Sequence, residues 1–334
     1  MRRVGEFELI EKFFSRPPRQ RSPGERAAAA RGVALGVGDD CALLQPAPGM
    51  QLAISSDMLV EGRHFLSTVA PERLGHKALA VNLSDLAACG AEPLGFTLAL
   101  ALPRADEAFI AALAHGLLAL ADAHDIELIG GDTTAGPLNI CITVFGQLPP
   151  GQALLRSGAR PGDELWVSGV LGDARLALEC FRGTLSLPGE HLQQVRLAME
   201  QPQPRLTLGR ALRGIASSAI DLSDGLVGDL GHILRRSGGL SAVVDIDAMP
   251  RSGALGGQPD AVQRLCLLAG GDDYELLFTA PREAHGDVLA AGRTAGVAVS
   301  CFGRIEAEGH GGLRVVDGSG RSVAAPQAGF DHFK

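Results

Sequence analysis

Residues 74–103, LGHKALAVNLSDLAACGAEPLGFTLALALP, combine one helical segment with one strand. Residues 74–89 are predicted to form a helix, because Gly90 is a typical helix end and Pro93 lies just beyond it. Residues 96–102 form a continuous apolar run that stops at Pro103, a pattern typical of a buried strand. The stretch therefore predicts a helix followed directly by a strand.

The segments around this stretch mix both kinds of element. Residues 106–124 place apolar side chains at helical spacing, and so do residues 6–14. Further strands are expected at 51–55, 126–129 and 140–146. Strands and helices do not alternate strictly, so the sequence predicts an α+β fold.

Pro149-Pro150-Gly151 is a candidate domain boundary, and a second set of elements follows it. Strands are expected at 164–169, 218–221, 242–247 and 274–280, and helices at 192–199, 205–215 and 283–295. We therefore expect two mixed α/β-sheet domains, residues 1–150 and residues 151–334.

The composition excludes several classes of protein. The chain has 334 residues, a formal net charge of −8 and 46% hydrophobic residues, which argues against a disordered chain and against nucleic-acid binding through a broad basic face. Its six cysteines form no CxxC pair, which favours reduced thiols in the cytoplasm. The longest apolar runs are far shorter than the roughly 20 residues that span a bilayer, so no membrane partner is expected.

Most of the candidate functional residues are aspartates that follow predicted strands or glycine-rich turns. They are Asp39 and Asp40, Asp57, Asp132, Asp221 and Asp224. Asp85 differs, because it lies in the apolar helix 74–89 on one face with Ala78 and Asn82, where a carboxylate is costly to bury without a cation or donor. Any single Asp after Gly is most simply a turn or a helix cap. As a set, oxygen ligands without His or Cys suit Mg²⁺.

An acidic, metal-binding site suits a phosphorylated substrate, with cations between carboxylates and phosphates. The sequence has no GxxxxGK[ST] loop, no kinase HRD or DFG motif and no GxGxxG after a strand. A phosphoryl-transfer enzyme of this kind would depend on metal ions, glycine-rich backbone and arginine, and Arg156 is the best-placed arginine.

Long motifs resemble those of the thiamine-monophosphate kinase family in order and spacing. They are GEFELI (5–10), GVGDDCALL (36–44), AISSDMLVEGRHF (53–65), KALAVNLSDLAACGAEP (77–93), LIGGDTT (128–134), LLRSGARPGDELWVSG (154–169), SAIDLSDGL (218–226), GGDDYELLF (270–278) and GFDHF (329–333). The resemblance implies a fold like that of aminoimidazole ribonucleotide synthetase, with dimerisation through the N-terminal domain. It also implies ATP-dependent phosphorylation of thiamine monophosphate to thiamine diphosphate by direct transfer, with several Mg²⁺ ions and no general base.

The resemblance also implies roles for individual residues. The metal ligands would be Asp39, Ser56, Asp57, Asp85, Asp132, Asp221 and Asp224, and the ATP contacts Gly131, Asp132, Arg156 and Ser223. The substrate contacts would be His64 and Asp272, with Gln327 or Phe330 near the position of a C-terminal aromatic residue in the family. Asp272 departs from the family's usual Glu by one methylene.

Two alternatives stay open at this point. Another ATP-using enzyme of the same fold, such as a selenophosphate or aminoimidazole ribonucleotide synthetase, would share much of the acidic set. A selenophosphate synthetase would carry a reactive cysteine near its start, and residues 1–40 have none. A non-catalytic nucleotide- or metal-binding relative is the other alternative, and the intact acidic set argues against it.

Overall fold

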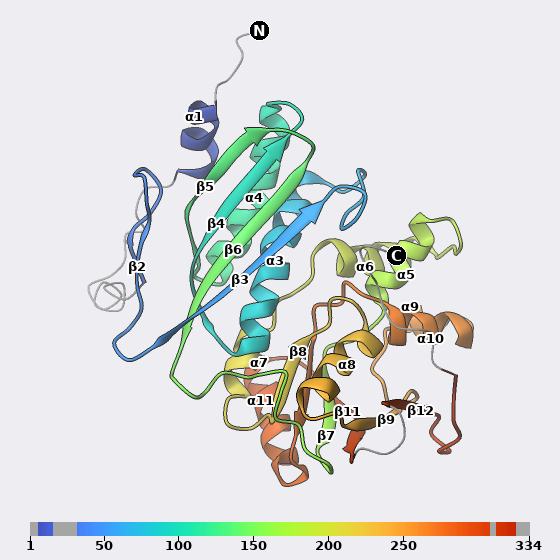
Figure 1. Ribbon diagram of the computed structural model, residues 1–334. Coiled ribbons are helices and arrows are strands. Elements are labelled where there is room, and N and C mark those ends of the chain that lie inside the picture. Colours follow the sequence, from blue (N-terminus) through green and yellow to red (C-terminus); the bar gives the residue numbers. More distant parts are fainter. Residues whose placement is uncertain (1–5, 16–31, 308–311, 325–334) are drawn as a thin grey trace. The chain divides into compact units, whose positions relative to one another are not determined.

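The structure is a computed structural model that describes residues 6–15, 32–307 and 312–324 (Figure 1). The chain divides into two compact units. Unit 1 comprises Met1–Leu86 and Ala91–Gly151, and unit 2 comprises Ala87–Gly90 and Gln152–Lys334. Each unit combines a mixed sheet with helices, so the α+β prediction is confirmed.

Unit 1 is built on a four-stranded sheet in the order β3-β6-β4-β5. These strands are β3 (Gln51–Val60), β6 (Asn139–Leu148), β4 (Glu92–Leu102) and β5 (Glu127–Ala135). The β3–β6 and β6–β4 pairs are antiparallel, and β4–β5 is parallel. Helices α3 (Pro71–Cys89) and α4 (Glu107–Ala123) cover one face of the sheet (Figure 1). The remaining elements are α1 (Glu6–Leu9), η1 (Ile10–Phe14), β1 (Gly32–Leu35) and β2 (Leu43–Gln45).

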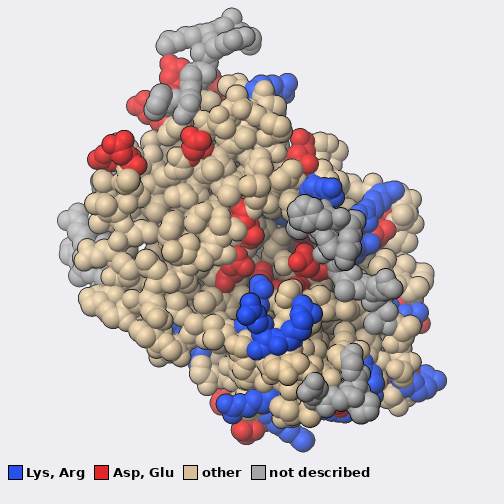
Figure 2. All heavy atoms as spheres, in the orientation of Figure 1, with Lys and Arg blue, Asp and Glu red and all other residues tan. Residues whose placement is uncertain are grey.

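The other face of this sheet keeps exposed apolar side chains on its edge strand β3. Leu52, Ile54 and Met58 are 45%, 61% and 52% exposed. They alternate along the strand with half-buried residues, as expected where one face packs on helices and the other does not. Figure 2 shows that the surface over this sheet carries few charged side chains.

Helices α3 and α4 approach each other closely at two glycines. A Cβ on Gly75 would lie 2.0 Å from the carbonyl oxygen of Leu113, and one on Gly116 would lie 1.8 Å from the carbonyl oxygen of Glu72. Each glycine therefore lies against the backbone of the opposite helix. This contact fixes α3, which carries Asp85, at one distance from α4.

Unit 2 is built on a six-stranded sheet in the order β12-β9-β11-β7-β10-β8, in which only β12–β9 is parallel. The strands are β7 (Glu164–Ser168), β8 (Ser218–Asp221), β9 (Ser241–Asp245), β10 (Leu276–Ala280), β11 (Val299–Glu306) and β12 (Leu313–Val316). The helices are α5 (Asp173–Phe181), α6 (Gly189–Glu200), α7 (Leu206–Ala211), α8 (Leu226–Arg236), α9 (Gly253–Gly256), α10 (Asp260–Ala269), η2 (Arg282–Ala284) and α11 (His285–Ala295).

Alternation along β7 assigns helices to the two faces of this sheet. Leu165 and Val167 belong to the core that α5, α8 and α10 cover. Trp166 points to the opposite face, where it stacks on Phe278 and meets the ring of His285 at the start of α11. Both faces of the sheet are therefore buried.

A tight turn follows β12, and the carboxylate of Asp317 holds it together. This carboxylate accepts hydrogen bonds from the hydroxyl and N–H of Ser319 and from the N–H and side chain of Arg321. These bonds lower the pKa of Asp317 from 3.8 to about 2. Because the folded-state pKa is depressed, the stabilisation is present above the unfolded value and is lost as the pH falls towards 2.

We expect the amides of Ser319 and Arg321 to lose protection against hydrogen exchange as the pH falls below about 4, where the carboxylate begins to protonate in the unfolded chain. The measurement is the ratio of observed to intrinsic exchange rates, followed by NMR. Asp317→Asn is the control, because an amide in this place does not titrate. A protection ratio that stays constant down to pH 2 in the unmodified protein would contradict the prediction.

Candidate functional site

A row of polar contacts joins β3 to α3 in unit 1. The hydroxyl of Ser55 donates to the carboxylate of Asp85 at 2.5 Å. Two residues further along the strand, the backbone N–H of Asp57 donates to Oδ1 of Asn82 at 3.0 Å. Polar contacts between a strand and the helix that covers it are costly unless each group is paired. The seam between β3 and α3 is therefore a candidate functional site.

Asn82 fixes the backbone at Asp57. Its side chain is 1% exposed, and its Nδ2 donates to the carbonyl of Ala78 at 3.0 Å. Because the Asp57 N–H can only donate and the Ala78 carbonyl can only accept, the orientation of the amide is determined by its partners. β3 is an edge strand of this sheet, so Asn82 pairs an N–H that no neighbouring strand could reach.

The structure brings Asp57 and Asp85 to the same side of β3, but it directs Ser56 to the other side. The Ser56 hydroxyl contacts the hydroxyl of Thr143 at 3.0 Å and the carbonyl of Ile142 at 3.1 Å, both on β6. Ser55, which the sequence analysis did not include among the site residues, takes the place beside Asp85. The period of two along a strand is the signal that could have identified it.

His64 lies in the turn after β3, and its ring is oriented by the backbone. Its Nδ1 accepts the N–H of Val60 at 2.9 Å, so a proton on the neutral ring is carried by Nε2. The carbonyl of His64 accepts from the amine of Lys77, a side chain only 2% exposed, at 3.2 Å. The ring of His64 and its backbone carbonyl thus both hold this turn in place.

The other sequence-predicted residues of unit 1 lie at the surface. Asp39 follows β1 and accepts the N–H of Asp40 at 2.9 Å. Asp132 is exposed and lies within β5, next to Gly131. Gly131 has φ +148°, and a Cβ there would lie 1.9 Å from the carbonyl oxygen of Leu98, so only glycine fits.

In unit 2, the end of β8 and the turn that follows it carry three of the predicted residues. Asp221 ends the strand and is 5% exposed, whereas Ser223 and Asp224 are half-buried in the turn to α8. Asp229 on α8 accepts the N–H groups of Asp224 and Gly225 at 3.2 and 3.1 Å. Burial and the charge of Asp224 raise the pKa of Asp229 to about 7. The carboxylate of Asp229 in α8 therefore fixes the backbone of the turn between β8 and α8.

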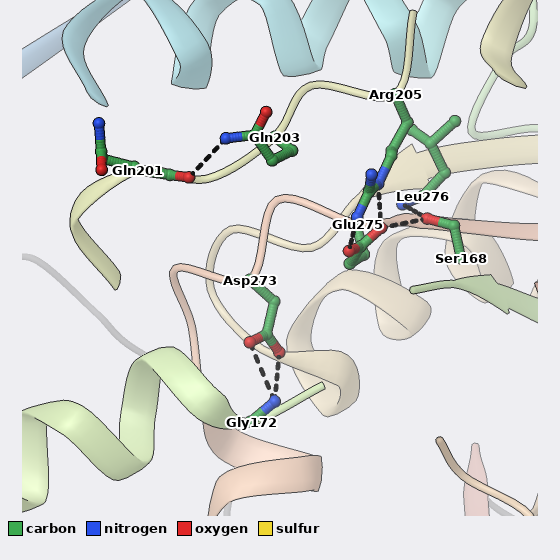
Figure 3. Close-up of polar contacts among 8 residues, drawn as sticks. All are labelled: Ser168, Gly172, Gln201, Gln203, Arg205, Asp273, Glu275 and Leu276. Carbon is green, nitrogen blue, oxygen red and sulfur yellow. Dashed lines mark hydrogen bonds and ion pairs between the residues drawn. The ribbon is translucent and has the colours of Figure 1, made fainter. Parts of the chain in front are cut away.

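The run Asp272–Glu275 pairs with this segment and is fixed by buried polar groups (Figure 3). Glu275 is 6% exposed and accepts from the hydroxyl of Ser168 at 2.5 Å and from Nε of Arg205 at 2.7 Å, and Arg205 Nη2 also donates to it. Burial alone would lower the pKa of Arg205, but the hydrogen bonds and charge of Glu275 raise it. Asp273 accepts the N–H of Gly172 with both carboxylate oxygens, at 2.9 and 3.1 Å.

The remaining predicted contacts are at the surface or outside the described residues. Arg156 is exposed in unit 2. Asp272 is half-buried, and the hydroxyl of Tyr274 contacts its carboxylate at 3.2 Å. Gln327 and Phe330 lie outside the described residues.

The donor set of unit 1 fits a hard cation. The groups at the seam are a carboxylate, a hydroxyl and a second aspartate, all oxygen donors. Within the part of the chain that the structure describes, no group of three His, Cys, Asp or Glu side chains is arranged to hold a metal by itself. Mg²⁺ does not require such a cage, because it commonly keeps water and uses one or two carboxylates together with substrate phosphates.

Known proteins resemble this chain over its whole length. Residues 38–148 match the family described as AIR synthase related protein, N-terminal domain. The thiamine-monophosphate kinase of Salmonella typhimurium is 46% identical, over 98% of each chain.

Solved structures agree with these sequence matches. The thiamine-monophosphate kinase of Stenotrophomonas maltophilia is 44% identical, with a TM-score of 0.81 over 90% of this chain and 95% of that chain. A structure described as AaThiL complexed with AMPPCP and TMP is 27% identical, with a TM-score of 0.74 over 100% of this chain and 99% of that chain. Identity at this level over nearly the full length shows that the chain belongs to the thiamine-monophosphate kinase family.

Proposed function

We propose that the protein transfers the terminal phosphoryl group of ATP to thiamine monophosphate, which gives thiamine diphosphate and ADP. The observation that carries this proposal is the 46% identity to a thiamine-monophosphate kinase over 98% of both chains. The oxygen-only donors of the β3–α3 seam support it, because a phosphoryl-transfer site must neutralise charge on both phosphates.

The residues divide into three proposed roles. In unit 1, Asp39, Asp57, Asp85 and Asp132 bind Mg²⁺, as do Asp221 and Asp224 in unit 2. Ser56, which the resemblance also assigns to this set, would have to turn its hydroxyl away from Ile142 and Thr143 of β6 to join them. Gly131, Asp132, Arg156 and Ser223 contact ATP. His64 and Asp272 contact the substrate, together with Gln327 or Phe330. Bound Mg²⁺ would supply charge neutralisation between the carboxylates and the phosphates.

The protein's own residues then have to align two phosphates rather than to remove a proton. The monoester oxygen of thiamine monophosphate is already a nucleophile near neutral pH, so a general base is not required. His64 is a donor through Nε2 when neutral, because Val60 occupies Nδ1. Arg156 supplies a fixed positive charge with a planar fork that suits phosphate. Alignment and charge neutralisation are therefore the main contributions of the protein to catalysis.

The test is an assay of the purified protein with Mg-ATP and either thiamine monophosphate or free thiamine. We expect ADP and thiamine diphosphate from the monophosphate, and little turnover of thiamine, because the set of carboxylates exceeds what one triphosphate needs. Equal turnover of both acceptors would refute the monophosphate as the substrate. ATP hydrolysis without any thiamine diphosphate would refute the kinase assignment.

We also propose that residues 1–150 and 151–334 are separate domains and that the first mediates homodimerisation. The resemblance implied dimerisation through the N-terminal domain, and the most exposed apolar side chains of its four-stranded sheet lie on the edge strand β3. Its apolar row of Leu52, Ile54 and Met58 supports a second copy of this chain as the occupant of this sheet face.

None of the six cysteines, all of which lie in the described part of the chain, is in a disulfide. This supports a reducing compartment, and we place the protein in the cytoplasm. Among the described residues, we find no helix with the length and apolar character that crossing a membrane requires.

Ile54→Lys is expected to convert the dimer to a monomer, because it places a charge in the middle of the apolar row. Sedimentation at micromolar concentration measures the change. Leu197→Lys is the matched control, since Leu197 is an apolar side chain 40% exposed on α6 of unit 2, outside the domain that is proposed to dimerise. A monomeric unmodified protein, or an Ile54→Lys variant that still sediments as a dimer, would contradict the proposed interface.

A further inference from the structure

The run Asp272–Glu275 contains two residues with unusual backbone conformations. Asp272 has φ 69° and Tyr274 has φ 49°, both in the left-handed region that side chains other than glycine rarely adopt. Such conformations cost free energy and persist only where the surroundings enforce them, and they concentrate at functional sites. The groups that enforce these two backbone conformations are therefore candidates for a functional role.

Asp273 and Glu275, which alternate with Asp272 and Tyr274 along the run, anchor it to the rest of unit 2. Asp273 binds the Gly172 N–H with both oxygens, and Glu275 binds Arg205 and Ser168 (Figure 3). The Glu275 carboxylate also lies against the backbone of Gly169, where a Cβ would be 2.0 Å from its Oε1. The two nitrogens of Arg205 fix the orientation of the carboxylate as well as its position.

Three backbone hydrogen bonds join the run Asp272–Glu275 to the segment after β8. The N–H of Asp272 donates to the carbonyl of Ser223 at 2.9 Å, and that of Tyr274 donates to the carbonyl of Leu222 at 2.8 Å. The N–H of Leu222 donates in turn to the carbonyl of Glu275 at 2.9 Å. One anchored run therefore sets the places of both Asp272 and Ser223.

We propose that Arg205 and Glu275 are positioning residues, whose ion pair holds Asp272 in register with Ser223 so that the acceptor and ATP are aligned. This inference rests on the proposed function, in which Asp272 contacts thiamine monophosphate and Ser223 contacts ATP. A pair that served only stability could be replaced by apolar side chains of similar size, because buried ion pairs are often exchanged for apolar groups at no cost. A positioning pair could not be replaced in this way, because apolar contacts do not fix an orientation.

The test is the double variant Arg205→Met with Glu275→Met. The matched control is Arg196→Met with Glu200→Met, which removes another largely buried ion pair of unit 2, 2.9 Å long on α6. We expect both variants to melt close to the unmodified protein. The first should show a KM for thiamine monophosphate raised about 10-fold or more, because small misplacements of aligned groups have large effects. Its Asp272 and Tyr274 amides should also exchange faster with solvent, whereas the control changes neither quantity.

A second variant covers the case in which the double variant fails to fold. Arg205→Lys keeps the charge but loses the planar fork, so it should also raise the KM and speed exchange at these two amides. Wild-type KM and wild-type exchange in Arg205→Lys or in the double variant would overturn the proposal. If the unmodified protein does not phosphorylate thiamine monophosphate, the proposed function fails, and the exchange rates alone then decide whether the pair holds the run.

Discussion

Asp57→Asn is expected to reduce kcat by on the order of 10²-fold or more while the protein stays folded. Asparagine keeps the size of the side chain and one acceptor oxygen but removes the charge, and a missing charge leaves phosphate repulsion unscreened in the transition state. The substitution does not remove the backbone bond from residue 57 to Asn82, which any residue except proline makes. The melting temperature without metal should stay level or rise, because Asp85 lies along the same seam and like charges repel.

Two further variants sharpen this comparison of kcat with melting temperature. Asp132→Asn should behave like Asp57→Asn, since Asp132 is proposed to bind metal and is exposed. Asp106→Asn is the control, because Asp106 caps α4 by accepting the N–H of Phe109 at 3.2 Å, and asparagine caps equally well. Near-normal turnover with a lowered melting temperature in Asp57→Asn would show that this aspartate only maintains local structure.

The sequence pattern predicted most of the elements but misplaced the candidate metal-binding aspartates within them. It expected Asp57 and Asp132 to follow their strands, whereas both lie inside β3 and β5. The strand was predicted to end at Ser55, before the polar pair Ser56-Asp57. In the structure, backbone pairing with β6 continues through it to Val60, because side chains of α3 satisfy the polar groups on one side. A tertiary contact therefore extended the strand beyond what local composition indicates.

The anchors in unit 2 had no signal in the sequence. Arg205 and Glu275 are 70 residues apart, and neither belongs to a spacing that indicates a pair. The left-handed backbone of Tyr274 is equally hidden, since a bulky residue gives no local reason to adopt it. By contrast, the apolar spacing of residues 106–124 predicted α4 to within one residue at each end, although Asp106 is its N-cap and not its first residue. Local signals thus gave the elements, and long-range pairs had to come from the structure.

Gly116→Ala is expected to destabilise unit 1, although the same change in most helices is stabilising. In an ordinary helix this change would stabilise by about 0.5–1 kcal/mol, because alanine loses less backbone entropy than glycine. Here the new Cβ would lie 1.8 Å from the carbonyl oxygen of Glu72, and a Cβ on the facing Gly75 would likewise lie 2.0 Å from the carbonyl oxygen of Leu113. Neither contact involves a flexible side chain that could move aside, so α3 and α4 must separate.

The separation would disturb the apolar contacts that both helices make with the sheet. Overpacking of this kind typically costs about 1–3 kcal/mol, which outweighs the gain from helix propensity. Thermal unfolding measures the change, at roughly 2–4 °C for each kcal/mol in a protein segment of this size. Gly228→Ala in α8 is the matched control, since nothing lies within 4 Å of its Cβ and a small gain is expected there. If Gly116→Ala instead raised the melting temperature as the control does, α3 and α4 would not be in backbone contact. Side-chain packing, and not backbone contact, would then set the distance between α4 and α3, the helix that carries Asp85.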